Sequence, residues 1–222
     1  MSNNDSFIDE VTEEVRRDRL YGAMRRYGWI GILAIALIVA GTAWREWDKR
    51  DAEARGRAFG DAVAAALQTQ DPAARAAALA AIEADPAQAP LLALLRSGEA
   101  VAAGDSAGAA AALRALAEAP GTPDLYRQFA RLKLVMAAGT AMDAAERDAI
   151  LSDLAAAGAP FRPLAMEQQA LALVDTGKPD EAITLARRIL DEPTVTPALR
   201  RRVAQLIVAL GGSPLGGDPA AN

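Results

Sequence analysis

The 222-residue sequence contains no cysteine and no histidine. Without cysteine the chain can form no disulfide, no catalytic thiolate and no thiolate metal site. Without histidine it lacks the commonest general base and the commonest transition-metal ligand. Much ordinary enzymology is thereby excluded, and we expect no catalytic residues, no metal and no cofactor.

An excess of basic residues is also missing. Lys and Arg total 24 against 29 Asp and Glu, which gives a net charge of −5. A surface that binds DNA or RNA needs clustered positive charge, so we expect no nucleic-acid partner. No stretch alternates apolar and polar residues with period two, and clusters of Val, Ile and Thr are rare. The predicted fold class is therefore all α.

The longest uncharged run is GWIGILAIALIVAGTAW, residues 28–44. As a helix rising about 1.5 Å per residue it spans roughly 25 Å, close to the hydrocarbon thickness of a bilayer. Tyr27, Trp29 and Trp44 lie near its two ends, where aromatic rings favour the interface between lipid and water. We predict a transmembrane helix over residues 28–44, with these three residues as interface anchors in a lipid bilayer.

Two other interpretations of this run are weaker. A buried core helix would need apolar neighbours around its whole circumference. A cleaved signal peptide begins with a short basic segment, whereas the 27 residues before this run carry six acids. We therefore expect an uncleaved anchor. Its orientation does not follow from charge, because the fifteen residues on each side contain five Lys and Arg.

The anchor divides the rest of the chain into a short head and a longer C-terminal part. In residues 1–27, apolar residues recur at helical spacing among charges, which predicts a short amphipathic helix over residues 7–26. This helix either docks on a membrane partner or only sets topology. We predict one helical domain over residues 45–212 and a disordered Gly/Pro-rich tail over residues 213–222.

The predicted domain has a repeated pattern. Ala/Leu-rich runs alternate with short breaks, and three of the breaks begin at Gly104, Gly139 and Gly177, spaced by 35 and 38 residues. A helix-turn-helix repeat near 34 residues is typical of tetratricopeptide arrays, in which each helix pair buries its apolar face by stacking on the next. The spacing predicts a degenerate tetratricopeptide-like array, with an unrelated helical bundle as the alternative.

Two of the breaks resemble the inter-helix turn of a tetratricopeptide repeat. Residues 177–183 read GKPDEAI, and residues 104–109 read GDSAGA. Each turn has an alanine five residues after its glycine. The glycine permits a left-handed backbone, and the small alanine lets two helices approach closely. We therefore predict positive φ at Gly177 and a close helix crossing at Ala182.

The first helix of the middle pair is the candidate interaction surface, because first helices line the concave groove of tetratricopeptide arrays. This helix is expected from residue 124 to residue 138. Four of its apolar residues have the spacing i, i+4, i+7, i+11, which predicts a core stripe. The stripe consists of Leu125, Phe129, Leu132 and Met136. The other aromatic and basic residues are typical of protein interfaces and are the partner-binding candidates. They are Tyr126, Arg127, Arg131 and Lys133.

Taken whole, the chain resembles the YfgM-like family of bacterial inner-membrane proteins. The resemblance rests on the head FIDEVTEEVRRDRL, the Tyr-Gly-Trp start of a single anchor at residues 27–29, a long exit helix and Ala-rich helix pairs. It implies a single-pass inner-membrane protein whose C-terminal domain is periplasmic. It also implies association with the Sec translocon and with periplasmic chaperones. No catalytic residues come with it.

Two classes of function are compatible with the sequence. The first is a non-catalytic scaffold, either an ancillary factor of the Sec translocon and its chaperones or an accessory subunit or assembly factor of another inner-membrane complex, such as a respiratory one. The second is an enzyme, which could rely only on carboxylates, Ser, Lys or Tyr. The adjacent acid pairs after the anchor are Asp180-Glu181 and Asp191-Glu192. Acids also gather at helix ends for electrostatic reasons, so we expect no enzyme. The sequence defines neither the partner complex nor the oligomeric state.

Overall fold

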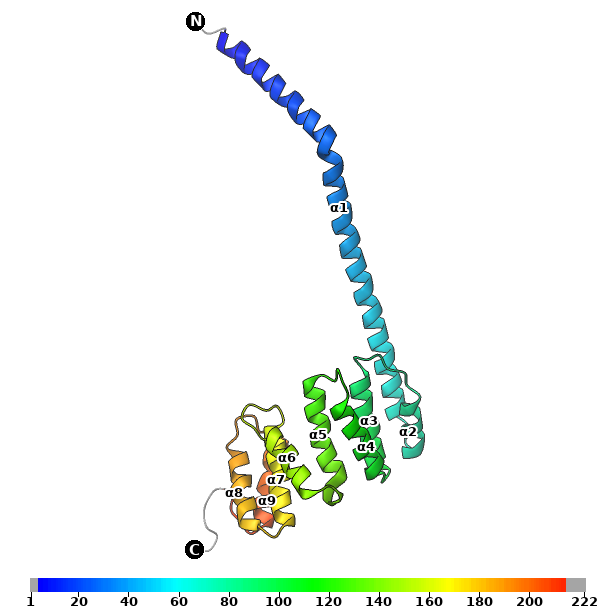
Figure 1. Cartoon of the computed structure of the whole chain (residues 1–222), viewed down its shortest axis with the longest axis vertical. Coiled ribbons are helices and arrows are strands. Elements are labelled where there is room, and N and C mark those ends of the chain that lie inside the picture. Colours follow the sequence, from blue (N-terminus) through cyan, green and yellow to red (C-terminus); the bar gives the residue numbers. More distant parts are fainter. Residues whose placement is uncertain (1–3, 215–222) are drawn as a thin grey trace. The chain divides into compact units, whose positions relative to one another are not determined.

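The computed structural model describes residues 4–214, and their side chains from Trp29 onward. Over these residues the regular structure is helical and contains no strand, which confirms the all-α prediction (Figure 1). The described chain falls into two units that meet between Asp61 and Ala62. The helices are α1 (Asn4–Leu67), α2 (Pro72–Ala80), α3 (Ala89–Ala102), α4 (Ser106–Glu118), α5 (Asp124–Ala138), the 3₁₀ helix η1 (Gly139–Ala141), α6 (Ala144–Leu154), α7 (Arg162–Asp175), α8 (Pro179–Leu190) and α9 (Pro197–Ala209).

Helix α1 is one continuous helix. It includes the expected head helix, the apolar run and the exit helix without interruption. The sequence explains this continuity, because the chain has no proline before Pro72. Beyond the apolar run, ion pairs one turn apart join Glu46 to Arg50 at 3.1 Å and Glu53 to Arg57 at 3.2 Å. Pairs of this kind each stabilise a helix by about 0.2–0.5 kcal/mol.

The apolar part of α1 has no protein neighbour among the described residues. Beginning at Trp29, the helix is long and apolar enough to cross a membrane by length and composition, and none of its most apolar stretch is buried. Large side chains such as Ile32 and Ile38 are exposed. Within the described residues, nothing surrounds this stretch as the neighbours of a core helix would.

Gly104 and Gly177 have the positive φ that their turn pattern predicts, 85° and 74°. Gly139 also has positive φ, but its φ of 51° and ψ of −129° lie outside the left-handed helical region. The alanines five residues after Gly104 and Gly177 are both completely buried, as the repeat pattern predicts, and they are Ala109 and Ala182. The middle turn departs from the pattern, because η1 follows Gly139 and α6 begins only after an Asp143 cap that accepts hydrogen bonds from two backbone N–H groups.

The glycine conformations predict that alanine substitution changes the free energy of unfolding in opposite directions at Gly177 and Gly98. Gly177→Ala should lower the free energy of unfolding by about 1 kcal/mol, since a β-carbon is disfavoured at positive φ. Gly98 lies inside α3 with open space where a β-carbon would be added. Gly98→Ala should therefore raise the free energy of unfolding by about 0.5–1 kcal/mol. Urea titrations of the two variants followed by circular dichroism test this, and a loss at both sites would contradict the assignment of the turn.

Two apolar clusters form the core of the repeat array. The first joins α3, α4, α5 and α6 and reaches the start of α7, and the second joins Met166 of α7 to α8 and α9. In α5 the buried residues are Ala130, Leu132, Leu134 and Val135. They are spread around the helix because α5 contacts α3 and α4 as well as α6.

The predicted core stripe of α5 is wrong at its two ends. Leu125 and Met136 are 56% and 53% exposed. Phe129 is half-buried and its ring lies 5.3 Å from that of Phe161, whereas Leu132 is buried as predicted. A single stripe is the expectation for a helix with one neighbour. A helix packed between several neighbours buries other positions and leaves part of the apparent stripe outside.

A charged contact ties α7 to α9. Glu167 is buried and accepts hydrogen bonds from Nε and Nη2 of Arg202 at 2.9 and 2.8 Å. This hydrogen bonding raises the pKa of Arg202. A buried carboxylate is tolerated only when it is paired in this manner. The contact therefore fixes the position of the last helix on the array.

Candidate interaction surfaces

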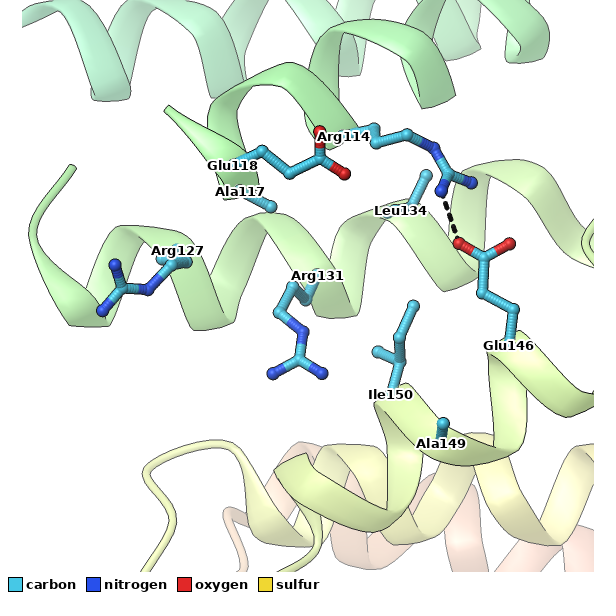
Figure 2. Close-up of a pocket in the computed structure, with 9 residues that line it drawn as sticks. All are labelled: Arg114, Ala117, Glu118, Arg127, Arg131, Leu134, Glu146, Ala149 and Ile150. Carbon is cyan, nitrogen blue, oxygen red and sulfur yellow. Dashed lines mark hydrogen bonds and ion pairs between the residues drawn. The ribbon is translucent and has the colours of Figure 1, made fainter. Parts of the chain in front are cut away.

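A pocket of about 420 Å³ lies between α4, α5 and α6 (Figure 2). We call it the α4–α6 pocket. Its lining combines apolar and charged side chains from the three helices. They are Arg114, Ala117 and Glu118 of α4, Arg127, Arg131 and Leu134 of α5, and Glu146, Ala149 and Ile150 of α6. Leu134 and Ile150 belong to the first core cluster, so the apolar part of the pocket is an extension of the core.

The three arginines of the α4–α6 pocket are held in ion pairs. Nη1 of Arg114 donates to Oε1 of Glu146 at 2.5 Å and so joins α4 to α6 (Figure 2). This hydrogen bond raises the pKa of Arg114. Nη2 of Arg131 donates to Asp153 at 2.8 Å. The arginines are therefore held in place by carboxylates of the chain itself.

Arg127 makes the third of these pairs, with Asp124 at the start of α5. Its Nη2 donates to Oδ1 of Asp124 at 2.8 Å. Hydrogen bonds from Arg127 and Gln128 lower the pKa of the Asp124 carboxyl. Exposed pairs of this type contribute only about 0–1 kcal/mol. A charged side chain of a partner can therefore replace an internal carboxylate at small cost.

The structure places two of the four predicted partner-binding residues in the α4–α6 pocket and the other two outside it. Arg127 and Arg131 are one turn apart on α5 and both line the α4–α6 pocket. Lys133 lies two residues beyond Arg131, so it is on roughly the opposite side of the helix, where it is half-buried. Tyr126 is half-buried and packs against the first core cluster. The α4–α6 pocket thus brings together two of the four residues.

Exposed large apolar side chains form a second candidate surface, which we call the first-helix surface. Between Pro72 and Leu190, a stretch that the structure describes throughout, these side chains lie on α3, α5 and α7, and α4, α6 and α8 contribute none. The first-helix surface consists of Leu91, Val101, Leu125, Met136 and Leu171. It is confined to the first helix of each pair.

The first-helix surface follows the repeat in the first two pairs. Val101 and Met136 are each the third residue before a turn glycine, Gly104 and Gly139 respectively. Equivalent positions in stacked repeats face the same side of the array. An exposed apolar residue thus recurs at this position in the first two pairs, whereas Val174, the third residue before Gly177, is half-buried.

Sequence reasoning misses part of both surfaces. Arg114 and Glu118 of the α4–α6 pocket stand one turn apart in an otherwise Ala-rich helix, which is a signal that could have found them. Glu146 gives no local signal, because it is 32 residues from its partner Arg114. Leu125 and Met136 fit the predicted core stripe, so their spacing points away from a surface role.

The predicted membrane-interface anchors lie on α1. Trp29 and Trp44 are 62% and 72% exposed. Trp47, less than one turn beyond Trp44, is exposed to the same extent and is a further candidate outside the predicted set. The side chain of Tyr27 lies outside the described side chains. The predicted disordered tail is described only as far as residue 214.

The adjacent acid pairs have structural roles. Asp180 and Glu181 lie in the first turn of α8, and Glu181 pairs with Lys178 at 3.4 Å. Glu192 accepts a hydrogen bond from Arg162 at 2.9 Å. In the part of the chain that the structure describes, no group of three or more acids could hold a metal ion. These carboxylates complete helix ends and ion pairs.

Stacked antiparallel helix pairs with glycine turns and exposed first helices define a helical-repeat protein of the interaction class. The chain belongs to the tetratricopeptide repeat-like domain family, whose family model matches residues 22–194. A search of curated proteins and a search of solved structures found no match. Domains of this family generally mediate protein–protein interactions and are typically non-catalytic. The predicted repeat array is thereby confirmed.

Proposed function

We propose that this chain is a non-catalytic protein-interaction scaffold of the bacterial inner membrane and an ancillary factor of the Sec translocon and its periplasmic chaperones. In this proposal residues 28–44 cross the bilayer once. Residues 1–27 form a cytoplasmic head, and residues 45–212 form the periplasmic domain. The observation that carries the proposal is the first-helix surface, since its large apolar side chains are exposed in an array whose family binds proteins.

The chemistry of the first-helix surface favours an apolar polypeptide segment as its ligand. Four of its five side chains are branched aliphatic residues, and the fifth, Met136, is unbranched and polarizable. Methionine adapts to ligands of varied shape. Chains that have just crossed a membrane expose apolar segments before they fold, and they need binding of low sequence specificity. A surface of this composition, in a chain that is anchored in the membrane, suits that task.

The proposal is tested by the proteins that co-purify with the full chain from membranes in mild detergent, identified by mass spectrometry. Translocon subunits and periplasmic chaperones are the expected partners. The double variant Leu125→Glu, Met136→Glu should recover these partners at least about tenfold less well, because charges replace apolar contacts. The matched control is Ala111→Glu, Ala112→Glu, which places the same two charges on exposed positions of α4.

Each alternative gives a different result in this experiment. If subunits of a respiratory or other inner-membrane complex are recovered in place of translocon subunits, the proposed partner is wrong. The proposal that the chain is a scaffold then still holds. Equal losses in the two double variants would contradict the assignment of binding to the first-helix surface.

Orientation gives a separate prediction. A fusion of alkaline phosphatase after Leu210 should be active, because this enzyme needs an oxidising compartment to form its disulfides. A long domain can be translocated largely regardless of its charge, so the equal basic content on the two sides of the anchor does not oppose this orientation. A silent phosphatase fusion, together with an active cytoplasmic reporter at the same site, would place the array in the cytoplasm and remove the translocon hypothesis.

A further inference from the structure

A second pocket, of about 400 Å³, lies between α6, α7 and α8. We call it the α6–α8 pocket. Its polar lining consists of Arg147 and Asp148 of α6, Gln169 of α7, Thr176 at the end of α7 and Lys178, the residue that precedes α8. Its apolar lining includes Leu173 of α7 and Leu185 of α8. Two cations thus stand beside an aliphatic wall.

The Nε–H of Arg147 is a buried donor that has no acceptor within the described part of the chain. The Arg147 side chain is 14% exposed. The nearest carboxylate oxygen, on Asp148, lies 3.7 Å from Nε, which is too far for a hydrogen bond. Asp148 is itself 71% exposed and is the adjacent residue in the chain. A buried guanidinium N–H left in this state is costly.

Two other half-buried arginines of the array use their Nε–H groups in hydrogen bonds to carboxylates. Arg75, 20% exposed, donates to Glu99 and to the carbonyl of Thr69. Arg162, 26% exposed, donates to Glu192 and to the carbonyl of Ala155. Arg147 is less exposed than either, yet its Nε–H is unused by the described residues. The Arg147 guanidinium thus differs from these two in having no carboxylate of the described residues at hydrogen-bond distance.

The groups next to Arg147 are also open to a ligand. Lys178 pairs with Glu181 at 3.4 Å, and both side chains are more than half exposed. Because exposed ion pairs contribute little free energy, a carboxylate of a ligand can replace Glu181 as the partner of Lys178 at small cost. The amide of Gln169 makes no hydrogen bond to the part of the chain whose side chains the structure describes, residues 29–214. A carboxylate is the acceptor that best matches a guanidinium, because it accepts two parallel hydrogen bonds.

We propose that the α6–α8 pocket binds an aliphatic carboxylate. The carboxylate accepts hydrogen bonds from Arg147, and the positive charge of Lys178 attracts it. The aliphatic part of the ligand packs on Leu173 and Leu185. This chemistry occurs in a free small acid and at the C-terminus of a polypeptide that ends in an aliphatic residue. The site does not depend on the first-helix surface or on the proposed partners.

The experiment uses the full chain in detergent micelles, labelled with ¹⁵N at arginine, and follows the Nε–H resonances. Isovalerate is titrated in parallel with isovaleramide, a neutral molecule of the same shape. The resonance of Arg147, identified by its loss in Arg147→Met, should shift and saturate at millimolar isovalerate and stay in place with isovaleramide. Arg188→Gln, which removes an exposed arginine of α8, is the control and should leave the titration unchanged.

Further arms distinguish the two sources of carboxylate. If acetyl-Ala-Leu with a free C-terminus binds more tightly than isovalerate and its amide does not bind, the ligand is a polypeptide terminus. If isovalerate binds and the dipeptide does not, the ligand is a free acid. Each of these results supports the site.

Three results would overturn the proposal. The first is that the Arg147 resonance does not shift with any of the acids. The second is that all arginine resonances shift alike, which indicates ionic strength alone. The third is that Arg147→Met still binds isovalerate as tightly as the wild type does, measured by calorimetry. The melting temperature of the variant shows that it is folded in this measurement.

Discussion

Replacement of Leu132 by alanine is expected to lower the free energy of unfolding by about 3 kcal/mol, the largest effect of a single substitution that we predict. Leu132 is 2% exposed and belongs to the first core cluster. Removing a buried leucine side chain costs the transfer free energy of the lost atoms and leaves a cavity, for a total of about 2–5 kcal/mol. Because α5 contacts α3, α4 and α6, few neighbours can move to fill that cavity.

The matched control is Leu125→Ala in the same helix. Leu125 is 56% exposed, so this change should alter the free energy of unfolding by less than about 0.5 kcal/mol. Both substitutions replace leucine by alanine in the same helix, so the difference between them reports mainly on burial. Urea titration of the full chain in detergent gives both values. If the free energy of unfolding falls equally in the two variants, Leu125 is part of the core stripe that the sequence predicts. It would then not belong to the first-helix surface.

The second large effect is expected at a helix crossing. Ala109 is completely buried, and it lies on α4, which contacts α3 and α5. Ala109→Leu inserts three carbon atoms where the helices approach, which should cost about 1–3 kcal/mol through displaced neighbours. The thermal unfolding of the variant, followed by circular dichroism, should show a correspondingly lower midpoint.

Ala112→Leu is the control for overpacking. Ala112 lies on the exposed side of the same helix, and leucine is nearly as good a helix former as alanine, so stability should remain within about 0.5 kcal/mol of the wild type. Ala182→Leu, at the equivalent position of the last pair, should behave like Ala109→Leu. A tolerated leucine at both buried positions would show that the helices do not depend on a small residue to pack.

The features predicted from the sequence are those that depend on neighbouring residues in the chain. An uncharged run, a glycine at a turn and an alanine five residues later each act within a few residues, so their patterns can be recognised without tertiary information. The positive φ of Gly177 and the complete burial of Ala182 follow from that local chemistry.

The features that could not be predicted depend on which helices pack together. Arg114 and Glu146 meet because α4 and α6 both border α5, and their 32-residue separation leaves no pattern. The exposure of Leu125 and Met136 depends on α5 having neighbours on several sides. The break at Gly139 resembles the other turns in sequence, but Asp143 rather than Gly139 sets the start of α6, so the alanine at the equivalent position, Ala144, is exposed.

The central claim, that the array binds polypeptides through its first helices at the membrane, is tested most directly by photocrosslinking in living cells. A photoreactive amino acid is placed at Met136 of α5 or at Ala112 of α4, both exposed. We expect crosslinks from position 136 to translocon subunits, periplasmic chaperones or exported chains, at a yield at least about tenfold above that from position 112. Equal yields from the two positions, or crosslinks from position 112 alone, would contradict the claim.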